Sequence, residues 1–419
     1  MKIKVIAPDA IRGRVVLPSS KSISNRALAI SALAGGDALV ENVSDCDDTR
    51  VMQSWLKECP EVVDIGAAGT AMRFSTALLA VSEGTHVITG SERMKHRPIG
   101  ILVEALRQLG AQIEYVDQDG FPPLRIVGNS KLLGGKVELS GSVSSQYISA
   151  LLMIGPMLKN GLILNLIDNV VSRPYIDMTL AVMKTYGAKV GWKNEQTIVV
   201  EPAPYQSCVY KVENDWSAAS YWYEMVALSP NADAEVVLPG LFAESLQGDS
   251  RGSEVFERLG VSTEHRGDEV VLRKNGKRVE RLDVDFVEMP DLAQTFVVTC
   301  CMMGIPFHFT GLQSLKIKET DRIEALKVEL KKLGFEIKDR NDSELLWNGQ
   351  RMTDNGQRTT VNGQLPIDTY EDHRMAMAFA PVALTNGCVV INEPQVVSKS
   401  YPNYWEDLKA VGFKIEEQK

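Results

Sequence analysis

The sequence Lys21-Ser22-Ile23-Ser24-Asn25-Arg26 is followed by an apolar run over residues 27–33 and then by Gly35-Gly36. The apolar spacing and the two glycines predict one amphipathic helix that starts near Ser24 and stops at the glycines. Lys21 and Arg26 would lie at its start, where the helix dipole disfavours positive charge by about 0.3–1 kcal/mol per group. Free backbone N–H groups at that end attract anions, and phosphate fits best. A capped surface helix with two solvated cations is the structural alternative.

The helix end at Gly35 introduces a pattern that recurs along the chain. A helix end, a glycine and a strand follow one another at five places, spaced by roughly 75 residues, which is much longer than the period of a solenoid repeat. Glycine suits the left-handed position that closes a helix. The five glycines are Gly110, Gly187, Gly260, Gly334 and Gly412. Each of the first four precedes a predicted strand–turn–strand hairpin, with turns at 118–120, 194–195, 266–268 and 341–342.

A second series of predicted helices alternates with the first and begins at cap-type residues. These helices start near Ser24, Thr70, Ser145, Asp215, Asp291 and Asp372. The two series predict six strand–helix–strand–helix–strand–strand repeats, of which the first lacks about one hairpin. Its second helix, over residues 49–57, leads directly to the glycines at 66–69.

The repeats predict an α/β protein of two domains with three repeats each. We expect residues 20–213 to form one domain, and residues 1–19 with 214–419 to form the other. Each domain would then gather three polar helix starts on one face. Two such faces, opposed across a cleft, would form an anion-binding site.

Composition limits the remaining classes of function. A length of 419 residues favours two domains, and 44% hydrophobic with 24% charged residues is typical of a soluble globular protein. No apolar run is long enough to span a bilayer, and Met1–Val5 predicts a strand rather than a signal peptide. The six cysteines lack metal-type spacing, Cys300-Cys301 are expected in an apolar helix, and a cytoplasmic location follows. A net charge of −9 argues against nucleic acid as the main partner.

Three polar segments of the first half are candidates for ligand binding. The glycines before Thr70 let the backbone approach a ligand, although the segment is not a P-loop. Residues 93–97 concentrate basic side chains just before a predicted helix at Ile99. Residues 142–146 offer hydroxyls and an amide, which suit a phosphorylated or sugar-like ligand.

The second half supplies acids and further cations at helix starts. Asp291 follows Pro290, residues 316–322 place two acids among three cations, and Arg374 opens an apolar helix. Lys399 lies in a polar loop before Tyr401. Each feature alone is compatible with an N-cap or a capping box. The recurrence of cations at the same phase of successive repeats favours a binding site.

Six segments in order resemble the motifs of the enolpyruvyl transferases, and among them the EPSP (5-enolpyruvylshikimate-3-phosphate) synthase family. They are residues 17–26, 69–73, 93–98, 141–146, 318–322 and 372–375, and they span essentially the whole chain. The resemblance implies two domains, each of three βαβαββ units around a pseudo-threefold axis. It implies transfer of the enolpyruvyl group of phosphoenolpyruvate to the 5-hydroxyl of shikimate 3-phosphate by addition and elimination, with release of phosphate. This is the shikimate-pathway step toward chorismate and the aromatic amino acids.

The resemblance also implies a cytoplasmic monomer that needs no metal or organic cofactor and is a target of glyphosate. It implies no nucleic-acid or membrane partner. The phosphate of phosphoenolpyruvate would be held by Lys21, Gly69, Arg97 and Gln146, and its carboxylate by Arg322, Arg374 and Lys399. Shikimate 3-phosphate would be held by Ser22, Arg26, Ser144, Ser145, Ser172, Tyr175 and Lys318. Asp291 is the implied base, with Glu319 and Lys399 as acid–base partners, and which group acts in which half-reaction stays open.

Two positions depart from the family pattern, because Ala67 stands where asparagine is usual and Phe74 where proline is frequent. We therefore expect retained activity with altered affinity for phosphoenolpyruvate, and an open question over glyphosate, although Gly69 keeps the small residue of sensitive members. One alternative is the sister transferase that acts on UDP-N-acetylglucosamine, but the loop over residues 93–97 lacks the cysteine expected there. The other is a non-catalytic anion-binding protein, which the short first repeat favours and the presence of Asp291, Glu319 and Lys399 opposes.

Overall fold

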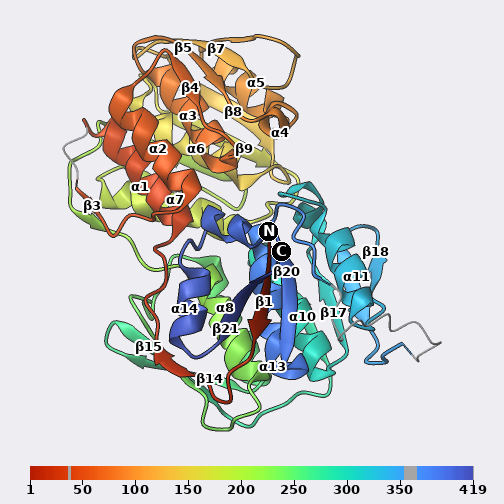
Figure 1. The fold of residues 1–419 in the computed structure, drawn as a ribbon. Helices are drawn as coiled ribbons and strands as arrows, with labels where there is room; N and C mark the ends of the chain where they lie inside the picture. Colours follow the sequence, from red (N-terminus) through yellow and green to blue (C-terminus); the bar gives the residue numbers. More distant parts are fainter. Residues whose placement is uncertain (36–38, 353–365, 419) are drawn as a thin grey trace. The chain divides into compact units, whose positions relative to one another are not determined.

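A computed structural model describes residues 1–35, 39–352 and 366–418 (Figure 1). The chain divides into two compact units, which are residues 19–213 and residues 1–18 together with 214–419. We call them the 19–213 unit and the 214–419 unit. Both mix helices and sheets, and the α/β fold predicted from the repeats is confirmed. Gly36, the second glycine of the first predicted helix stop, lies outside the described residues.

The 19–213 unit contains three sheets in its described part. One has the order β4-β5-β7-β6, with β4 (Val62–Asp64), β5 (Gly84–Thr89), β6 (Gln112–Tyr115) and β7 (Leu124–Gly128). Another has the order β10-β11-β9-β8, with β8 (Gly135–Ser140), β9 (Leu162–Ile167), β10 (Val190–Trp192) and β11 (Thr197–Val200). The third pairs only β3 (Val40–Glu41) with β12 (Tyr210–Lys211), in parallel. In its described residues the first repeat therefore has no closing hairpin, as the sequence predicts.

Helices connect these strands in the predicted order. They are α1 (Lys21–Leu33), α2 (Asp47–Glu58), α3 (Gly69–Val81), α4 (Glu92–Lys95), α5 (Gly100–Gln108), α6 (Ser145–Ile154) and α7 (Arg173–Thr185), with a 3₁₀ turn η1 (Gly155–Met157). Helix α3 joins the parallel strands β4 and β5, and α6 joins the parallel strands β8 and β9. These are the crossovers of the predicted βαβαββ repeat.

The first helix corrects the prediction, because α1 begins at Lys21 rather than near Ser24. Ser20 is its N-cap, and the Ser20 hydroxyl accepts a hydrogen bond from the backbone N–H of Ile23 at 3.4 Å. The sequence contains several serines here, and spacing alone did not show which of them caps the helix. Helix α2 likewise begins at Asp47, two residues before the predicted start.

The 214–419 unit also contains three sheets in its described part. Their orders are β14-β15-β13-β2, β16-β17-β19-β18 and β20-β1-β21. The strands are β1 (Lys2–Ile6), β2 (Arg12–Arg14), β13 (Glu235–Pro239), β14 (Val261–Arg266), β15 (Glu269–Lys274), β16 (Leu282–Asp285), β17 (Phe307–Thr310), β18 (Lys338–Arg340), β19 (Glu344–Trp347), β20 (Cys388–Asn392) and β21 (Lys414–Gln418). The N-terminal strands β1 and β2 thus complete sheets whose other strands lie more than 200 residues later in the chain.

The α-helices of the 214–419 unit are α8 (Trp216–Leu228), α9 (Gly252–Arg258), α10 (Ala293–Met303), α11 (Arg322–Lys332), α12 (His373–Phe379), α13 (Ala383–Asn386) and α14 (Tyr404–Ala410). Its 3₁₀ helices are η2 (Gly248–Arg251), η3 (Pro290–Leu292), η4 (Gln313–Ile317), η5 (Ala380–Val382) and η6 (Pro394–Lys399). Lys399 therefore ends a 3₁₀ helix, whereas the sequence predicted a polar loop there.

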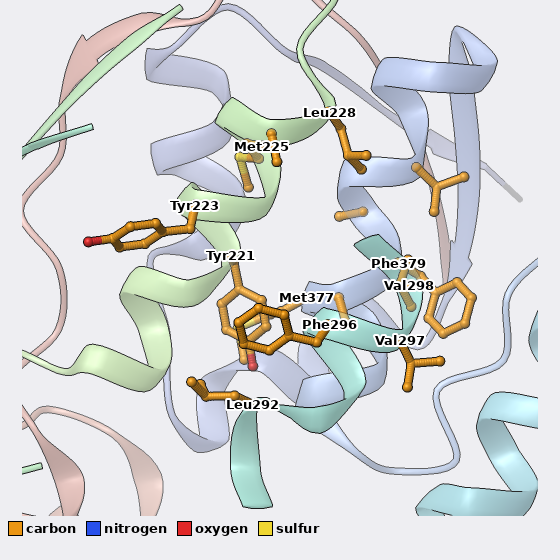
Figure 2. Packing of buried hydrophobic residues seen from close by; sticks show 14 of the residues in the cluster. Tyr221, Tyr223, Met225, Leu228, Leu292, Phe296, Val297, Val298, Met377 and Phe379 are labelled. Carbon is orange, nitrogen blue, oxygen red and sulfur yellow. The ribbon is translucent and has the colours of Figure 1, made fainter. Parts of the chain in front are cut away.

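Each unit has its own hydrophobic core. In the 214–419 unit the core lies among α8, α10 and α12, whose side chains converge in Figure 2. Every residue of α8 is buried, which explains its lack of a polar face. Cys300 and Cys301 are buried thiols in α10, as predicted. Burial in two separate cores explains how a chain of this length folds as two compact units.

The glycines that end the second helix of a repeat adopt the expected backbone conformation. Gly110, Gly187, Gly260, Gly334 and Gly412 all have positive φ, between +83° and +102°. A residue with a Cβ is disfavoured there, so these positions fix where the helices stop. In the part of the chain that the structure describes, no helix is long and apolar enough to cross a membrane.

Candidate active site

In the 19–213 unit the N-terminal ends of α1, α3 and α6 meet. The side-chain amide of Gln146, in the first turn of α6, donates to the Thr70 hydroxyl at the start of α3 at 3.0 Å. One turn deeper, Arg26 of α1 donates to the Ser149 hydroxyl of α6 at 3.1 Å and lies 5.4 Å from the ring centre of Phe74 in α3. The three positive helix ends therefore lie at one end of the unit, as the repeat pattern predicts.

The sequence placed Arg26 at the helix start, but it lies in the second turn of α1. It is only 2% exposed. Its guanidinium donates to the hydroxyls of Thr179 and Ser149 and to the carbonyls of Ser22 and Tyr175. Among the described residues it forms no ion pair, and burial lowers its pKa to about 10. A buried cation without a counter-ion costs several kcal/mol, so this position favours an anionic ligand.

The start of α3 brings two guanidinium groups to one glycine. A Cβ placed on Gly69 would lie 2.7 Å from Nη1 of Arg97 and 3.2 Å from Nη1 of Arg73. Arg73 is buried and donates to the carbonyls of Gly69 and Pro98 at 3.0 and 3.3 Å. The absence of a side chain at Gly69 therefore makes room for Arg97 beside the helix N-terminus, which is an arrangement suited to a phosphate.

The other residues implied for this unit lie at helix starts as well. Lys21 is the first residue of α1, and its ammonium lies 3.5 Å from the Asp48 carboxylate of α2. Ser144 is the N-cap of α6, and Ser172 precedes α7 in the left-handed conformation at φ 55°. Ser22 and Ser145 lie in the first turns of α1 and α6, and the Tyr175 carbonyl accepts from Arg26.

In the 214–419 unit the starts of α8, α10 and α12 meet around Arg374. Its guanidinium lies 3.0 Å from the carboxylate of Asp291, which lies in η3 directly before α10. It also donates to the Tyr221 hydroxyl at 3.3 Å and to the Ser217 hydroxyl at 3.5 Å, both in α8. Side chains of α8 and η3, which are distant from α12 in the sequence, thus converge on one cation.

Arg322, the first residue of α11, connects three carboxylates. Its guanidinium lies 3.1 Å from Asp291, 2.9 Å from Glu319 and 2.7 Å from Asp372. Its side chain is 1% exposed. Burial opposes the charge, but the three carboxylates together raise the pKa of Arg322 above its ordinary value. Arg322 therefore fixes the relative positions of the acids that the sequence singled out.

Two lysines complete this group of charges. The Lys399 ammonium lies 3.0 Å from Glu319, and the Lys318 ammonium lies 3.5 Å from Asp291. Burial would raise the pKa of Asp291, but Arg374, Lys318 and Arg322 together hold it well below its usual range. Asp291 is thus ionised at neutral pH and can act as a base once an anionic ligand draws these cations away.

The structure brings the implied residues together in two groups, one in each unit. It adds residues that the sequence reasoning did not single out as ligands or partners, namely Asp48, Arg73, Ser217, Tyr221, Asp249 and Asp372. Asp372 was noted only as a helix start, yet it is fully buried against Arg322. Only a contact between distant segments reveals such pairs, and the sequence carries no local signal for them.

The sequence profile of a family described as EPSP synthase (3-phosphoshikimate 1-carboxyvinyltransferase) matches residues 5–60 and 53–408. The chain belongs to the EPSP synthase family. A 3-phosphoshikimate 1-carboxyvinyltransferase of Bacteroides fragilis is 61% identical over 416 residues, which is 99% of each chain. One of Sulfurovum sp. is 37% identical over 429 residues, covering 96% of this chain and 97% of the relative.

Solved structures agree with this assignment at the level of the fold. An EPSP synthase of Acinetobacter baumannii superposes with a TM-score of 0.77, at 20% sequence identity and with complete coverage of both chains. The two-domain EPSP synthase fold is therefore confirmed.

Proposed function

We propose that the two groups of charged residues bind the two substrates of the EPSP synthase reaction. The activity itself follows from family membership: the protein is a 3-phosphoshikimate 1-carboxyvinyltransferase that acts on shikimate 3-phosphate and phosphoenolpyruvate. The residue roles, a monomeric state, a cytoplasmic location and sensitivity to glyphosate are our proposals. The observation that carries the residue roles is the gathering of cations at helix N-termini in each unit.

The phosphate groups are assigned to the 19–213 unit. The start of α3 with Arg97, together with Lys21 and Gln146, supplies donors for the phosphate of phosphoenolpyruvate. Shikimate 3-phosphate takes the side of Arg26, with Ser22, Ser144, Ser145, Ser172 and Tyr175. Arg26 has no counter-ion among the described residues, and this supports the assignment because a bound phosphate would offset its buried charge.

The carboxylate of phosphoenolpyruvate is assigned to the 214–419 unit. Arg374 and Lys399 offer a planar fork and an ammonium group for it. Arg322 would bind the same carboxylate only by exchanging one of its three protein partners, so its larger role is to position Asp291 and Glu319. Lys318 would meet shikimate 3-phosphate from beside Asp291.

The reaction requires one proton to reach C3 of phosphoenolpyruvate and another to leave the 5-hydroxyl of shikimate 3-phosphate. Asp291 takes the hydroxyl proton while the oxygen bonds to C2, and Glu319 with Lys399 delivers a proton to C3. One proton of the C3 methyl group of the tetrahedral intermediate then returns to the Glu319–Lys399 pair, and the bond between C2 and the phosphate oxygen breaks, which gives the enol ether and phosphate. When the anionic substrates engage Arg374 and Lys318, the pKa of Asp291 rises toward that of a useful base.

Release of inorganic phosphate tests this proposal. Phosphate should appear only when both substrates are present, and not when UDP-N-acetylglucosamine replaces shikimate 3-phosphate. Asp291→Asn should lower kcat by about 10²–10⁴, the usual contribution of a general base. Asp283→Asn is the matched control, because Asp283 is an exposed acid of the same unit that pairs with Arg281. Equal loss of activity in both variants, or none in Asp291→Asn, would contradict the assignment.

A further inference from the structure

Asp249 is a buried acid near Arg374 and Asp291, and the proposed mechanism assigns it no role. It lies in η2 and is 5% exposed. One of its carboxylate oxygens accepts a hydrogen bond from the Ser217 hydroxyl. Its other oxygen, Oδ1, is buried and has no hydrogen-bond partner among the described residues. An ionised carboxylate with an unsatisfied buried oxygen is costly, so this geometry favours the neutral acid.

The surroundings of Asp249 come from three other elements. Ser217 and the N-cap Asp215 belong to the start of α8, Asp291 to η3 and Arg374 to α12. Burial raises the pKa of Asp249 to about 7, and the charge of Asp291 adds to the rise, while Arg374 and Ser217 oppose it. Asp291 faces the same arginine and stays ionised. Two carboxylates with different protonation thus share one cation.

Ser217 connects Asp249 with Arg374 by hydrogen bonds. Its hydroxyl donates to Asp249 and accepts from Arg374 at 3.5 Å. A hydroxyl has one proton, so the direction of its bond to Asp249 decides what it offers to Arg374. If Asp249 is ionised, Ser217 donates to it and turns a lone pair toward the guanidinium. If Asp249 is protonated, it can donate to Ser217 instead, and Arg374 is held less firmly.

We infer that Asp249 is a positioning residue that acts on Arg374 through Ser217 and makes the affinity for the substrate carboxylate depend on pH. The inference rests on the proposed role of Arg374 as a ligand of the phosphoenolpyruvate carboxylate. With Asp249 neutral, one negative charge fewer competes with an incoming anion for Arg374. With Asp249 ionised, a second negative charge competes with that anion. Binding of phosphoenolpyruvate therefore favours protonation of Asp249, and by linkage affinity falls as pH rises.

The KM for phosphoenolpyruvate, measured from pH 6 to 8.5 at saturating shikimate 3-phosphate, tests this inference. Asp249→Asn keeps the size and polarity of the side chain but cannot ionise. The ratio of wild-type KM to variant KM should rise about tenfold over this range, which corresponds to a coupling of one pKa unit. The titration of the substrates is common to both enzymes and cancels in the ratio.

Two further variants make the result specific. Ser217→Ala removes the connection, so the ratio of wild-type KM to the KM of this variant should also rise with pH, which provides a second test if Asp249→Asn fails to fold by circular dichroism. Glu224→Gln is the matched control, because Glu224 is a buried acid with a raised pKa that does not contact Arg374, and it should keep the wild-type pH dependence. A KM ratio that stays constant with pH in Asp249→Asn and Ser217→Ala would overturn the inference.

Arg374→Gln separates this inference from the proposed function. If that variant leaves the KM for phosphoenolpyruvate unchanged, the assignment of the carboxylate to Arg374 fails. If it raises the KM while Asp249→Asn keeps the wild-type pH dependence, the assignment stands and only the role of Asp249 is refuted.

Discussion

At the scale of single residues, the strongest sign of a ligand is Arg26, a buried cation with no counter-ion among the described residues. Arg26 is held by four neutral oxygens and by the face of Phe74. The Arg26 guanidinium lies over the Phe74 ring, 5.4 Å from its centre, so this ring is part of how Arg26 is fixed. Proteins seldom bury such a charge unless something else offsets it.

Replacement of Arg26 should separate ligand binding from stability. Arg26→Met should weaken binding of shikimate 3-phosphate roughly 10- to 100-fold, the value of one or two charged hydrogen bonds. The loss in free energy of unfolding should stay within about 1 kcal/mol, because removal of the buried charge relieves its desolvation. Isothermal titration calorimetry and urea unfolding measure the two quantities. Arg107→Met is the control, since Arg107 also lies over an aromatic ring, that of Tyr115, but at the surface. Equal weakening of shikimate 3-phosphate binding in Arg26→Met and Arg107→Met would refute the assignment of Arg26 to this substrate.

Gly69 offers a second test at the same scale. Gly69→Ala places a methyl group against the tip of the Arg97 guanidinium, which must shift because 2.7 Å is shorter than any ordinary contact. The KM for phosphoenolpyruvate should rise severalfold while kcat changes less, since the loss is in binding of the phosphate. Gly191→Ala in β10 is the control, because a Cβ there meets nothing within 4 Å. An unchanged KM in Gly69→Ala would show that Arg97 does not hold this phosphate.

Sequence and structure differ most at the residue scale. The cations themselves could be predicted, because they recur at helix starts. Their partners could not, since Arg26 and Thr179 are 153 residues apart and Arg322 and Asp372 are 50 apart. Such pairs depend on how repeats pack against one another, which local spacing does not encode.

At the scale of elements, helix α8 shows how complete burial of a helix affects the protonation of an acidic side chain. All thirteen of its residues are buried, and one of them, Glu224, is an acid. Both of its carboxylate oxygens are buried, and burial raises its pKa well above the ordinary value, against a smaller opposing effect of the Thr299 hydroxyl. A charged carboxylate would be unfavourable there, so Glu224 is neutral in the folded protein.

This raised pKa has a predictable effect on stability. The folded state keeps the proton of Glu224 and the unfolded state loses it above its own pKa of about 4.3, so stability falls as pH rises through that value. Glu224→Gln removes this contribution. Its free energy of unfolding relative to wild type should therefore increase by more than about 1 kcal/mol between pH 5 and pH 8. Urea unfolding at the two pH values measures it, with Glu254→Gln on the exposed face of α9 as control. If the difference in free energy of unfolding between Glu224→Gln and wild type did not depend on pH, Glu224 would not be neutral in the folded protein.

Helix boundaries show what the repeat pattern could and could not determine. The predicted starts near Thr70, Ser145, Asp215 and Asp372 agree with α3, α6, α8 and α12 within one residue. The start of α1 was placed three residues too late, because Ser20, Ser22 and Ser24 are all good caps and only the tertiary structure selects Ser20. A glycine fixes the end of a helix more sharply than a serine fixes its start.

At the scale of the whole molecule, each unit repeats one arrangement. Three helix N-termini meet in the 19–213 unit around Arg26 and Gly69, and three meet in the 214–419 unit around Arg374. The number of repeats was predictable from the spacing of the glycines, and so was the missing hairpin of the first repeat. Which unit binds the phosphates and which binds the carboxylate could not be predicted, because this depends on which repeats carry acids as well as cations.

We propose that phosphate groups bind the helix starts of the 19–213 unit and that the enolpyruvyl carboxylate binds the arginines of the 214–419 unit. A crystal structure with the product EPSP tests it most directly, because this one molecule carries a ring phosphate and an enolpyruvyl carboxylate. We expect the ring phosphate within hydrogen-bonding distance of Ser144, Ser145 or Ser172, and the enolpyruvyl carboxylate beside Arg374. Electron density that places the ring phosphate away from these serines, or the carboxylate away from Arg374, would contradict it.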